Sequence, residues 1–399
     1  MPNNWPIVPL RESVQPVERP VTPVPGTVYR QIGVRLWGQG AYQREPMDGS
    51  ETKYSTLSRV EDGDIIVNKI WARNGSVAVV SKGVAGAYVS SEFPTFAPTR
   101  QKLDPRWFHW FTKTLNCWEQ CDEKSRGTSG KNRIRPEQFL EIAIPLPPLD
   151  EQRRIVARIE ALAAKIEEAR SLRQNSVEEA QAFVASETNA LFTGEDIRRW
   201  PTKTLEEVAE VRSGVTLGRQ LRGRTIRLPY LRVANVQDGH LDLTKIKEVE
   251  VLESEADKWK LQRGDLLLTE GGDWDKLGRG TVWLGEIPNC IHQNHIFCVR
   301  TRQDDFIPEF LAKFIGSPVG RAYFQGASKQ TTNLASINQR QLKAFKIFQP
   351  PLREQRRIVA ELEALQAKVG ALKALQAETA AELDAFLPSI LDKAFKGDL

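Results

Sequence analysis

Arginine and glycine alternate along one stretch of the sequence, between residues 212 and 227. The arginines are Arg212, Arg219, Arg222, Arg224 and Arg227, and the glycines between them are Gly214, Gly218 and Gly223. Guanidinium groups on a glycine-rich loop can approach phosphates closely and can form two parallel hydrogen bonds with a guanine edge. A solvated basic loop without a ligand has the same composition. The stretch by itself therefore leaves nucleic-acid binding and a bare surface loop equally open.

Two polar, cationic loops occur one in each half of the chain. Residues 127–133 read Gly-Thr-Ser-Gly-Lys-Asn-Arg, and residues 328–333 read Ser-Lys-Gln-Thr-Thr-Asn. They lie 203 residues apart but differ at most positions, as two readers of different base sequences would require. Ordinary divergence of surface loops would look similar. The candidate DNA-binding residues here are Lys131, Arg133, Lys329, Gln330, Thr331 and Asn333.

Cations beside tryptophans form a third candidate group. Lys69 and Arg73 flank Trp71, and Arg279 follows Trp274 in the second half of the chain. Aromatic rings next to cations can contact bases or sugars. Tryptophans of this kind more often pack at the edge of a core, and packing is the preferred interpretation of the two rings. The three cations are kept as DNA-binding candidates.

The residue types that bind metals or catalyse reactions give little support for an enzyme. Cys290, His292, His295 and Cys298 resemble a zinc-binding set, but their spacing places all four in one expected strand, where alternate residues point to opposite faces. Glu51-Thr52-Lys53 matches the end of a nuclease motif, without a suitable upstream acid or a repeated copy. The nucleotide-binding, hydrolase and zinc-protease motifs are absent from the sequence, as are the Asn-Pro-Pro-Tyr and Asp-Pro-Pro-Tyr strings of amino-methyltransferases.

Length and composition are those of an ordinary water-soluble protein. A chain of 399 residues accommodates two globular domains plus helices, and its net charge of +5 is compatible with a polyanionic partner without requiring one. No apolar run approaches the roughly 18 residues of a membrane span, and the N-terminus has no signal-peptide core. Four cysteines are too few for a disulfide framework. We expect a cytoplasmic protein.

The candidate residues are positioned by a chain that repeats itself. Residues 151–162 read Glu-Gln-Arg-Arg-Ile-Val-Ala-Arg-Ile-Glu-Ala-Leu, and residues 354–365 repeat this segment with two differences. Pro-Pro-Leu-x precedes each copy, and strong helix formers follow it, so each copy is expected to begin a helix. Apolar residues then recur at alternating steps of four and three, which is typical of a coiled-coil seam.

These seams predict two long helices, over residues 150–192 and 353–395. Each seam weakens midway, at Arg173 and Ser176 in the first helix and at Gln376 and Thr379 in the second. Pro388 should end or kink the second helix at Leu387, leaving a short helical tail that closes at Gly397. Roughly 35 residues of helix would measure about 50 Å. Two such helices in one chain are expected to pair antiparallel.

The globular parts repeat as well, less obviously. Gly63-Asp64 precedes an aliphatic run, as does Gly264-Asp265, and each pair is interpreted as a turn leading into a buried strand and not as a catalytic acid. The first globule has no counterpart to residues 213–219. The predicted fold is α+β, with two tandem domains of mixed strand and helix at residues 1–146 and 197–348. Helical segments follow them at 147–196 and 349–399, the latter including a C-terminal tail, and the whole has a pseudo-twofold internal repeat.

With its two Pro-Pro-Leu-x-Glu-Gln-Arg-Arg-Ile-Val helix starts, the chain resembles the specificity subunit of a type I restriction-modification system. The resemblance implies two target-recognition domains that read the halves of a bipartite DNA site. It also implies that the helices set the gap between the half-sites and bind two adenine-N6 methyltransferase subunits, and that a motor-nuclease restriction subunit joins for cleavage. S-adenosylmethionine would belong to the methyltransferase partners, and this chain would hold no cofactor and no catalytic residue.

The repeated arginines Arg153, Arg154, Arg356 and Arg357 are the candidate partner-binding residues. The shortened start of the first domain makes a symmetric list of DNA contacts unsafe. A different class of function also remains open, that of a coiled-coil scaffold whose globular domains bind protein. Binding of duplex DNA in the presence of methyltransferase partners distinguishes the two.

Overall fold

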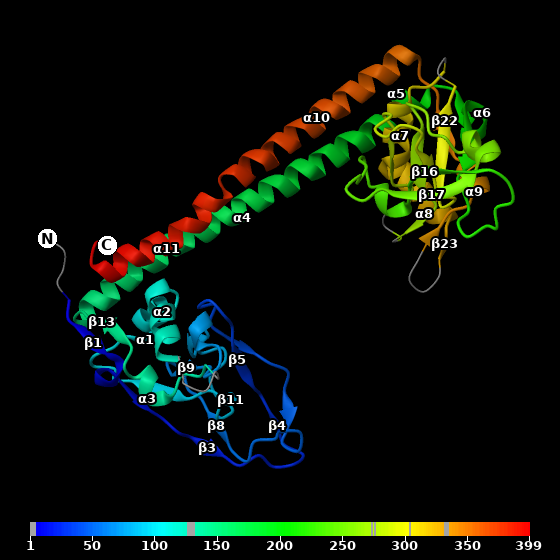
Figure 1. Ribbon diagram of the computed structural model, residues 1–399. Helices are drawn as coiled ribbons and strands as arrows, with labels where there is room; N and C mark the ends of the chain where they lie inside the picture. Colours follow the sequence, from blue (N-terminus) through cyan, green and yellow to red (C-terminus); the bar gives the residue numbers. More distant parts are fainter. Residues whose placement is uncertain (1–4, 126–131, 273, 275–276, 303–304, 331–334) are drawn as a thin grey trace. The chain divides into compact units, whose positions relative to one another are not determined.

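A computed structural model describes residues 5–125, 132–272, 274, 277–302, 305–330 and 335–399 (Figure 1). The chain forms two compact units, Met1–Arg173 with Gln376–Leu399, and Gln174–Leu375. Both divisions fall inside the long helices, at the positions where the predicted coiled-coil seams weaken. Each unit therefore combines one globular domain with the first part of one long helix and the last part of the other.

The first unit is built on a four-stranded antiparallel sheet in the order β10, β9, β12, β2. These strands are β2 (Val14–Pro16), β9 (Ile65–Val67), β10 (Val77–Val79) and β12 (Thr95–Pro98). Along β9, Ile65 and Val67 pack into one core and Ile66 into another. Successive side chains of a strand point to opposite faces, so this uninterrupted aliphatic run means that both faces of the sheet are covered.

The helices of the first unit cover the face of Ile65 and Val67. They are α1 (Pro105–Phe111), α2 (Leu115–Ser125), α3 (Pro136–Phe139), the start of α4 (Leu149–Thr193) and α11 (Ala380–Lys396). Short strands cover the other face or close the domain: β1 (Ile7–Pro9) with β13 (Ala143–Pro145), and β3 (Pro20–Val21), β4 (Val28–Tyr29), β5 (Ile32–Val34), β6 (Ala41–Gln43), β7 (Met47–Asp48), β8 (Leu57–Arg59) and β11 (Tyr88–Val89). The 3-10 helices are η1 (Leu10–Glu12) and η2 (Ala72–Asn74).

The second unit repeats this sheet, in the order β20, β18, β22, β15. Its strands are β15 (Ala209–Ser213), β18 (Leu266–Thr269), β20 (Gly280–Val282) and β22 (Ile296–Thr301). Leu266 and Leu268 enter the helix-covered core and Leu267 enters the opposite one, as in the first unit. The predicted duplication of an α+β domain is thus confirmed strand by strand.

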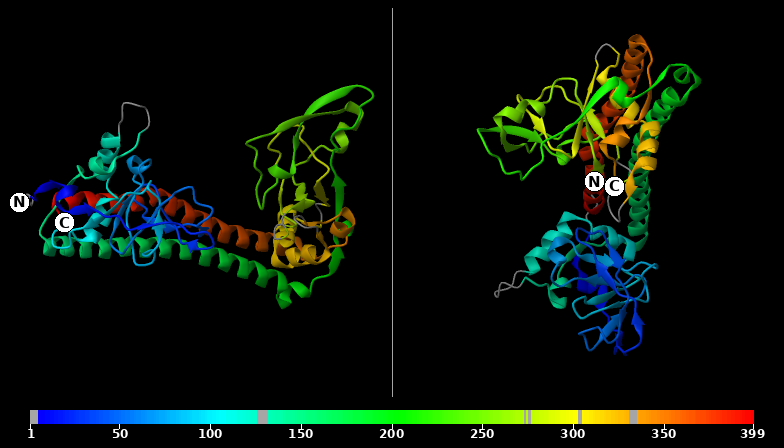
Figure 2. Two further views of the ribbon diagram at one scale, coloured as in Figure 1. Left: turned by 90° about the horizontal axis from the view of Figure 1, so that it is seen from below. Right: turned by 90° about the vertical axis from the view of Figure 1, so that its right-hand side faces the viewer.

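The remaining elements of the second unit follow the same plan with longer strands. They are α5 (Glu195–Arg198), β14 (Thr202–Thr204), α6 (Leu205–Val208), β16 (Thr225–Leu231), η3 (Val233–Asn235), β17 (Lys247–Leu252), η4 (Glu253–Lys258), β19 (Gly271–Gly272), β21 (Ile291–His292), α7 (Pro308–Gly316), α8 (Pro318–Ala327), β23 (Lys329–Gln330), β24 (Ala335–Ser336), α9 (Gln339–Lys343), β25 (Lys346–Phe348) and α10 (Leu352–Glu378). The hairpin of β16 and β17, coloured green, projects from the rest of this unit (Figure 2).

The two Gly-Asp pairs have the structural role that the sequence predicts. Asp64 accepts a hydrogen bond from the Glu61 amide at 2.7 Å and pairs with Arg19 at 2.6 Å. Asp265 accepts from the Gln262 amide at 2.7 Å and pairs with Arg300 at 2.7 Å. Both carboxylates are buried, so each closes the turn before the central strand and is neutralised there by an arginine.

The long helices agree with the predicted bounds except near Pro388. Helix α4 is continuous from Leu149 to Thr193, whereas the second helix breaks at Thr379 and then runs through Pro388 to a left-handed cap at Gly397. Of the two alternatives predicted for Pro388, ending the helix at Leu387 is wrong, and a kink there stays a prediction. The predicted closure at Gly397 is confirmed. A proline inside a helix removes one hydrogen bond, and here α11 packs Leu391 and Ala394 into the core of the first unit, which offsets that loss.

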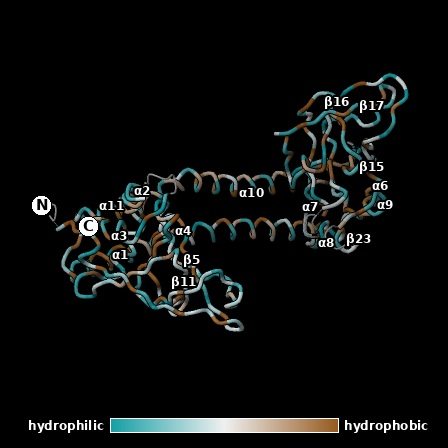
Figure 3. The backbone as a smooth tube through the Cα atoms, turned by 60° about the horizontal axis from the view of Figure 1, so that its bottom comes forward, coloured by the Kyte–Doolittle hydropathy of each residue, from teal (hydrophilic) through white to brown (hydrophobic). Residues whose placement is uncertain are grey.

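Side-chain contacts establish the antiparallel pairing within the first unit. Arg170 of α4 pairs with Asp384 of α11 at 2.8 Å, and Arg173 donates to the Thr379 hydroxyl at 2.6 Å. Polar groups therefore bond to each other where the seam lacks apolar residues. In Figure 3 hydrophilic and hydrophobic residues alternate along both long helices, as expected for helices that bury one face.

Candidate nucleic-acid interface

Two predicted DNA-binding residues of the first unit, Lys69 and Arg133, lie on neighbouring segments beyond the end of β9. The Lys69 amide donates to the Glu92 carbonyl at 3.1 Å, and the Ile134 amide donates to the Lys69 carbonyl at 2.9 Å. Arg133 pairs with the Glu92 carboxylate at 3.2 Å. The turn after β9 and the segment that follows the first predicted loop are therefore joined by backbone hydrogen bonds.

The second unit has the same backbone arrangement with different side chains. The Glu270 amide donates to the His295 carbonyl at 3.0 Å, and the Ile337 amide donates to the Glu270 carbonyl at 2.9 Å. Here a carboxylate stands where the first unit has Lys69, and it contacts His295 Nδ1 at 2.6 Å. One frame thus presents different polar groups in the two units, as the sequence predicts for the loops.

The tryptophans of these segments do not pack into the cores. Trp71 is 45% exposed and Trp274 is 47% exposed, so the preferred interpretation of core-edge packing is wrong for both rings. Trp71 immediately precedes the 3-10 helix η2, in which Ala72 is buried. Arg73, in η2, is half-buried. In the first unit, the exposed Trp71 ring lies two residues from Lys69 on the turn after β9.

Arg279 lies beside the end of β18. Its carbonyl accepts a hydrogen bond from the Thr269 amide at 3.1 Å, and its side chain is half-buried. Among the described residues, its Nε is a buried donor without a hydrogen-bond partner. A buried guanidinium nitrogen without an acceptor among the described residues is costly.

The basic loop of the second unit begins beside the same frame. The Val215 amide donates to the His292 carbonyl at 2.8 Å, and the Asn294 amide donates to the Val215 carbonyl at 3.0 Å. Arg219 lies 3.5 Å from Glu255 and Arg224 lies 3.0 Å from Glu253, so η4 partly neutralises the loop. Arg222 is exposed and, within the described part of the chain, takes part in no ion pair.

Five predicted DNA-binding residues fall where side chains are not placed. Lys131, Thr331 and Asn333 lie outside the described residues. Lys329 and Gln330 form β23, whose backbone pairs with β24. On its other side β24 pairs with Gly271 and Gly272 of β19, so β24 lies between β23 and β19. The loop strand and the turn after β18 thus belong to one small sheet, β19-β24-β23.

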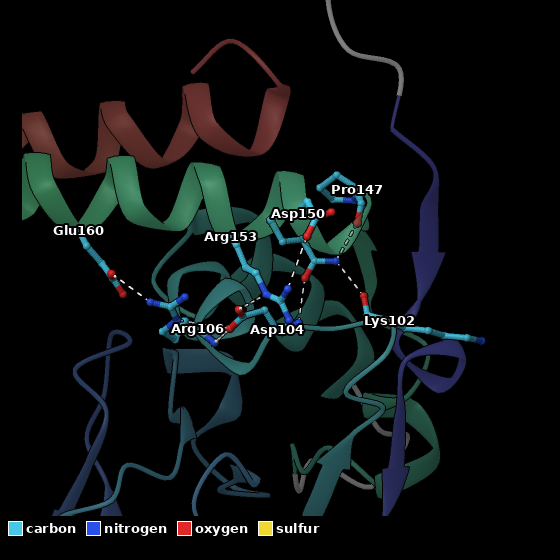
Figure 4. A network of polar contacts seen from close by, with 8 residues as sticks. Lys102, Asp104, Arg106, Pro147, Asp150, Arg153 and Glu160 are labelled. Atoms are coloured by element: carbon cyan, nitrogen blue, oxygen red, sulfur yellow. Dashed lines mark hydrogen bonds and ion pairs between the residues drawn. The ribbon is translucent and has the colours of Figure 1, made fainter.

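The repeated helix starts hold a buried glutamine that the sequence reasoning missed. Gln152 is fully buried; its amide donates to the carbonyls of Lys102 and Pro147 at 2.8 Å each and its oxygen accepts from the Asp104 amide at 2.9 Å. Figure 4 shows the start of α4 facing Lys102 and Asp104, the residues before α1. The same glutamine occurs in both repeated helix starts, and this repetition is the sequence feature that could have indicated its role.

Gln355 repeats this arrangement in the second unit. Its amide donates to the carbonyls of Asp305 and Pro350 at 2.9 and 2.8 Å, and its oxygen accepts from the Ile307 amide at 2.9 Å. All three partners are backbone groups of the segments next to α7 and α10. Each glutamine therefore fixes the start of a long helix to the domain that precedes it.

The four partner-binding candidates surround these glutamines on the exposed face. Arg154 pairs with Glu151 at 2.8 Å and Arg357 with Glu354 at 2.7 Å, and each hydrogen-bonded arginine holds the pKa of its carboxylate below the usual range. Arg153 lies 3.5 Å from Asp150, and Arg356 is exposed. Arg153 also lies 3.9 Å from Asp104 of the first domain, and Arg154 donates to the Leu399 carbonyl at 3.1 Å (Figure 4 shows Arg153 beside Asp104). All four arginines are exposed at the two helix starts.

The cysteine and histidine segment of the second unit is not one strand, contrary to the prediction. Residues 291–292 form β21 and residues 296–301 form β22, which belong to different sheets, because Gln293 begins a turn closed by the Ile296 amide at 2.9 Å. Burial lowers the pKa of His292 to about 4 and raises the pKa of Cys290 to about 12. Among the described residues, no three His, Cys, Asp or Glu side chains gather as a metal site.

Known proteins match this chain over most of its length. The family model described as "Type I restriction modification DNA specificity domain" matches residues 39–178 and 197–379. The EcoKI specificity subunit of Escherichia coli (strain K12) is 28% identical over 305 residues, which are 72% of this chain and 64% of that protein. The StySPI specificity subunit of Salmonella potsdam is 24% identical over 310 residues, 74% of this chain and 66% of that one. The matched part thus spans slightly under two thirds of these relatives.

Solved structures give the same result. The HsdS subunit from Thermoanaerobacter tengcongensis is 26% identical, with a TM-score of 0.63 over 100% of this chain and 98% of that one. A chain from a structural study of complex assembly and conformational transition of the type I R-M system is 26% identical. Its TM-score is 0.71, and the match covers 100% of this chain and 99% of that one. Within the described residues, no helix is both long enough and apolar enough to cross a membrane. Because the family model covers both globular domains and most of both long helices, the chain belongs to the type I restriction modification DNA specificity domain family.

Proposed function

We propose that this chain is the DNA-recognition subunit of a type I restriction-modification complex. Residues 1–146 and 197–348 are its two target-recognition domains, and each reads one half of a bipartite site. The observation that carries this proposal is the repeated frame around Lys69 and Glu270, which has the same backbone hydrogen bonds but presents different side chains. Two domains with one fold and different surface groups suit two different half-sites.

The proposed contacts divide into phosphate and base contacts. Lysines and arginines supply salt-dependent affinity for phosphates, and side chains that reach base edges select sequence at roughly 1 to 3 kcal/mol for each good bidentate pair. The proposed DNA-binding residues of the first domain are Lys69, Arg73, Lys131 and Arg133. Those of the second are Arg219, Arg222, Arg224, Arg279, Lys329, Gln330, Thr331 and Asn333. Exposed Arg222, which forms no ion pair within the described part of the chain, is the strongest candidate in the second domain.

The helical segments 147–196 and 349–399 are proposed to set the gap between the half-sites and to bind two methyltransferase subunits. Arg153, Arg154, Arg356 and Arg357 stand at equivalent places on the two helix starts. Because the repeat places the same exposed groups at both starts, each can bind an identical partner subunit. A motor-nuclease restriction subunit joins this assembly for cleavage.

Catalysis is assigned to the partner subunits and not to this chain. The methyltransferase partners bind S-adenosylmethionine, and this chain supplies sequence selection. The titratable groups of the described residues support this division. Asp64 and Asp265 are occupied by arginines, and His292 is buried against the Ile296 carbonyl. We place the assembled complex in the cytoplasm, where chromosomal and incoming DNA are accessible.

The test is an exchange of residues 197–348 for the matching domain of a family member with a different specificity. The chimaera is expressed with methyltransferase partners, and methylated adenines are mapped in the host genome. One half of the methylated sequence should change and the other should persist. A change in both halves would contradict separate readers. Absence of duplex binding by the unmodified chain with its partners would favour a protein-binding scaffold instead.

A further inference from the structure

The first domain contains a pocket of about 490 Å³ next to the frame around Lys69. Its walls come from four places: the start of β5, the chain between β6 and β8, the turn after β9, and β11 with the segment that follows it. Trp71 and Tyr54 stand in its wall and are 45% and 40% exposed. The pocket therefore opens on the surface that carries Lys69 and Arg133, the proposed DNA-binding surface.

In the second domain the basic loop begins beside His292 and Asn294. There, residues 215–221 of the basic loop lie against residues 249–252, Glu255 and Trp259, and leave a space of only about 40 Å³. The loop is anchored through the Val215 hydrogen bonds to His292 and Asn294, and Gly214 packs so closely that a Cβ there would lie 2.0 Å from the His292 carbonyl.

The first domain lacks this loop in its sequence. Its counterparts of His292 and Gln293 are Val89 and Ser90, 203 residues earlier, and both line the 490 Å³ pocket. The first domain thus has an open pocket beside Val89 and Ser90, whereas the second domain has the start of its arginine-rich loop beside His292 and Asn294.

Some charged side chains of the pocket already form hydrogen bonds or ion pairs within the protein, and others do not. Glu92 is paired with Arg133, and the Glu51 carboxylate accepts the Asp48 amide at 3.2 Å. Arg44 and Lys53 are exposed and, within the described part of the chain, their side chains form no hydrogen bond or ion pair. The pocket thus offers two free cations, two exposed aromatic rings and two carboxylates with remaining acceptor capacity.

We propose, on the basis of the proposed function, that this pocket is the base-reading site of the first domain, with Arg44, Lys53, Tyr54 and Trp71 as its specificity-determining residues. The first domain reads its half-site with exposed side chains around a recess, which reach the base edges in a DNA groove. The second domain reads with a loop that projects. The Glu51-Thr52-Lys53 segment, which resembles part of a nuclease motif, is in this arrangement a wall of the reading site.

The composition of the pocket favours base edges over phosphate. A phosphate site is built from cations and backbone amides, and carboxylates within it would repel the ligand. Base edges present both donors and acceptors: arginine and lysine donate to guanine, a carboxylate accepts from the cytosine amino group, and apolar groups contact the thymine methyl. Met47, Ile70 and Phe93 supply apolar surface in the same pocket. Exposed aromatic rings add stacking that a phosphate cannot use.

The experiment measures sequence selection by the full chain in complex with its methyltransferase partners. Lys53→Ala, Arg44→Ala, Trp71→Ala and Trp71→Phe are each compared with Lys82→Ala, an exposed lysine of the same domain outside the pocket. Binding is selected from a duplex library randomised in both half-sites. Discrimination at one or more positions of the first half-site should fall by roughly 5- to 150-fold in the alanine variants. The second half-site should stay unchanged, and Trp71→Phe should retain part of the selection.

Each other outcome is informative. An unchanged first half-site in all pocket variants overturns this inference and leaves the proposed function intact. A uniform loss of affinity across all sequences assigns the pocket to phosphate contact and also overturns it. If the unmodified complex selects no sequence, the proposed function itself fails. Thermal unfolding of each variant identifies a folding defect, in which case the exposed substitutions Lys53→Ala and Arg44→Ala decide.

Discussion

Replacement of Gln355 by methionine should destabilise the second unit without creating a cavity. Gln355 is fully buried, and its side chain satisfies two carbonyls and one amide of the backbone. Methionine has a similar volume and shape but bonds to none of these groups. Each buried backbone group left without a partner costs about 1 to 3 kcal/mol. The free energy of unfolding of this unit should therefore fall by about 3 kcal/mol, the lower end of the range for three groups.

The measurement is urea unfolding of the complete chain, followed by far-UV circular dichroism and tryptophan fluorescence. Gln355→Ala should lose about 1 kcal/mol more than Gln355→Met, because it adds a cavity. Gln181→Met is the matched control, since Gln181 is an exposed glutamine on α4 in the same unit and should change stability by no more than about 0.5 kcal/mol. Gln152→Met should reproduce the loss in the first unit.

The reasoning would be refuted if Gln355→Met cost less than about 1 kcal/mol, or no more than Gln181→Met. That result would mean that water or backbone movement satisfies the three groups. The repeated glutamine would then be a remnant of the duplication and would not fix the helix to the domain.

Three further substitutions and one insertion test other parts of the argument. Asp265→Ala leaves Arg300 without its carboxylate and should cost about 3 kcal/mol in urea unfolding; a loss below about 1 kcal/mol would show that the pair is dispensable. Burial lowers the pKa of His292 to about 4 from an ordinary 6.5, so as the pH falls the unfolded chain binds a proton before the folded chain does. The free energy of unfolding should therefore be largest above about pH 6.5 and decrease towards pH 4, by at most about 3 kcal/mol. His292→Asn should reduce this dependence on pH. An unaltered slope would contradict that assignment. Arg222→Ala should lower the salt dependence of DNA binding by about one phosphate contact without changing the selected sequence; an altered second half-site would instead make Arg222 a base reader. A heptad inserted into either long helix should change the gap in the methylated site and leave the half-sites intact; a constant gap would refute the proposed spacing role.

Much of this architecture could be predicted because the duplication is visible in local sequence. Proline, glycine and helix-forming residues act on their immediate neighbours, so the two helix starts, the Gly-Asp turns and the cap at Gly397 follow from the residues themselves. The absence of a segment equivalent to residues 213–219 is also visible in the sequence. The pocket of the first domain lies between segments that are distant in the chain, so it could not be predicted from the sequence.

The tertiary structure decided everything that depends on contacts between distant residues. The sequence alone indicated that Gln152 and Gln355 are repeated, but their burial follows from backbone groups about 50 residues earlier in the chain. Pro388 can lie inside α11 because α11 packs into the core of the first unit. Helix propensity describes only neighbouring residues and does not include the stabilisation from this packing. Trp71 is exposed for the same kind of reason: whether an aromatic ring is buried depends on which segments the fold brings over it. Local sequence thus determined the elements and their repetition, whereas long-range packing determined which of their side chains remain free to bind.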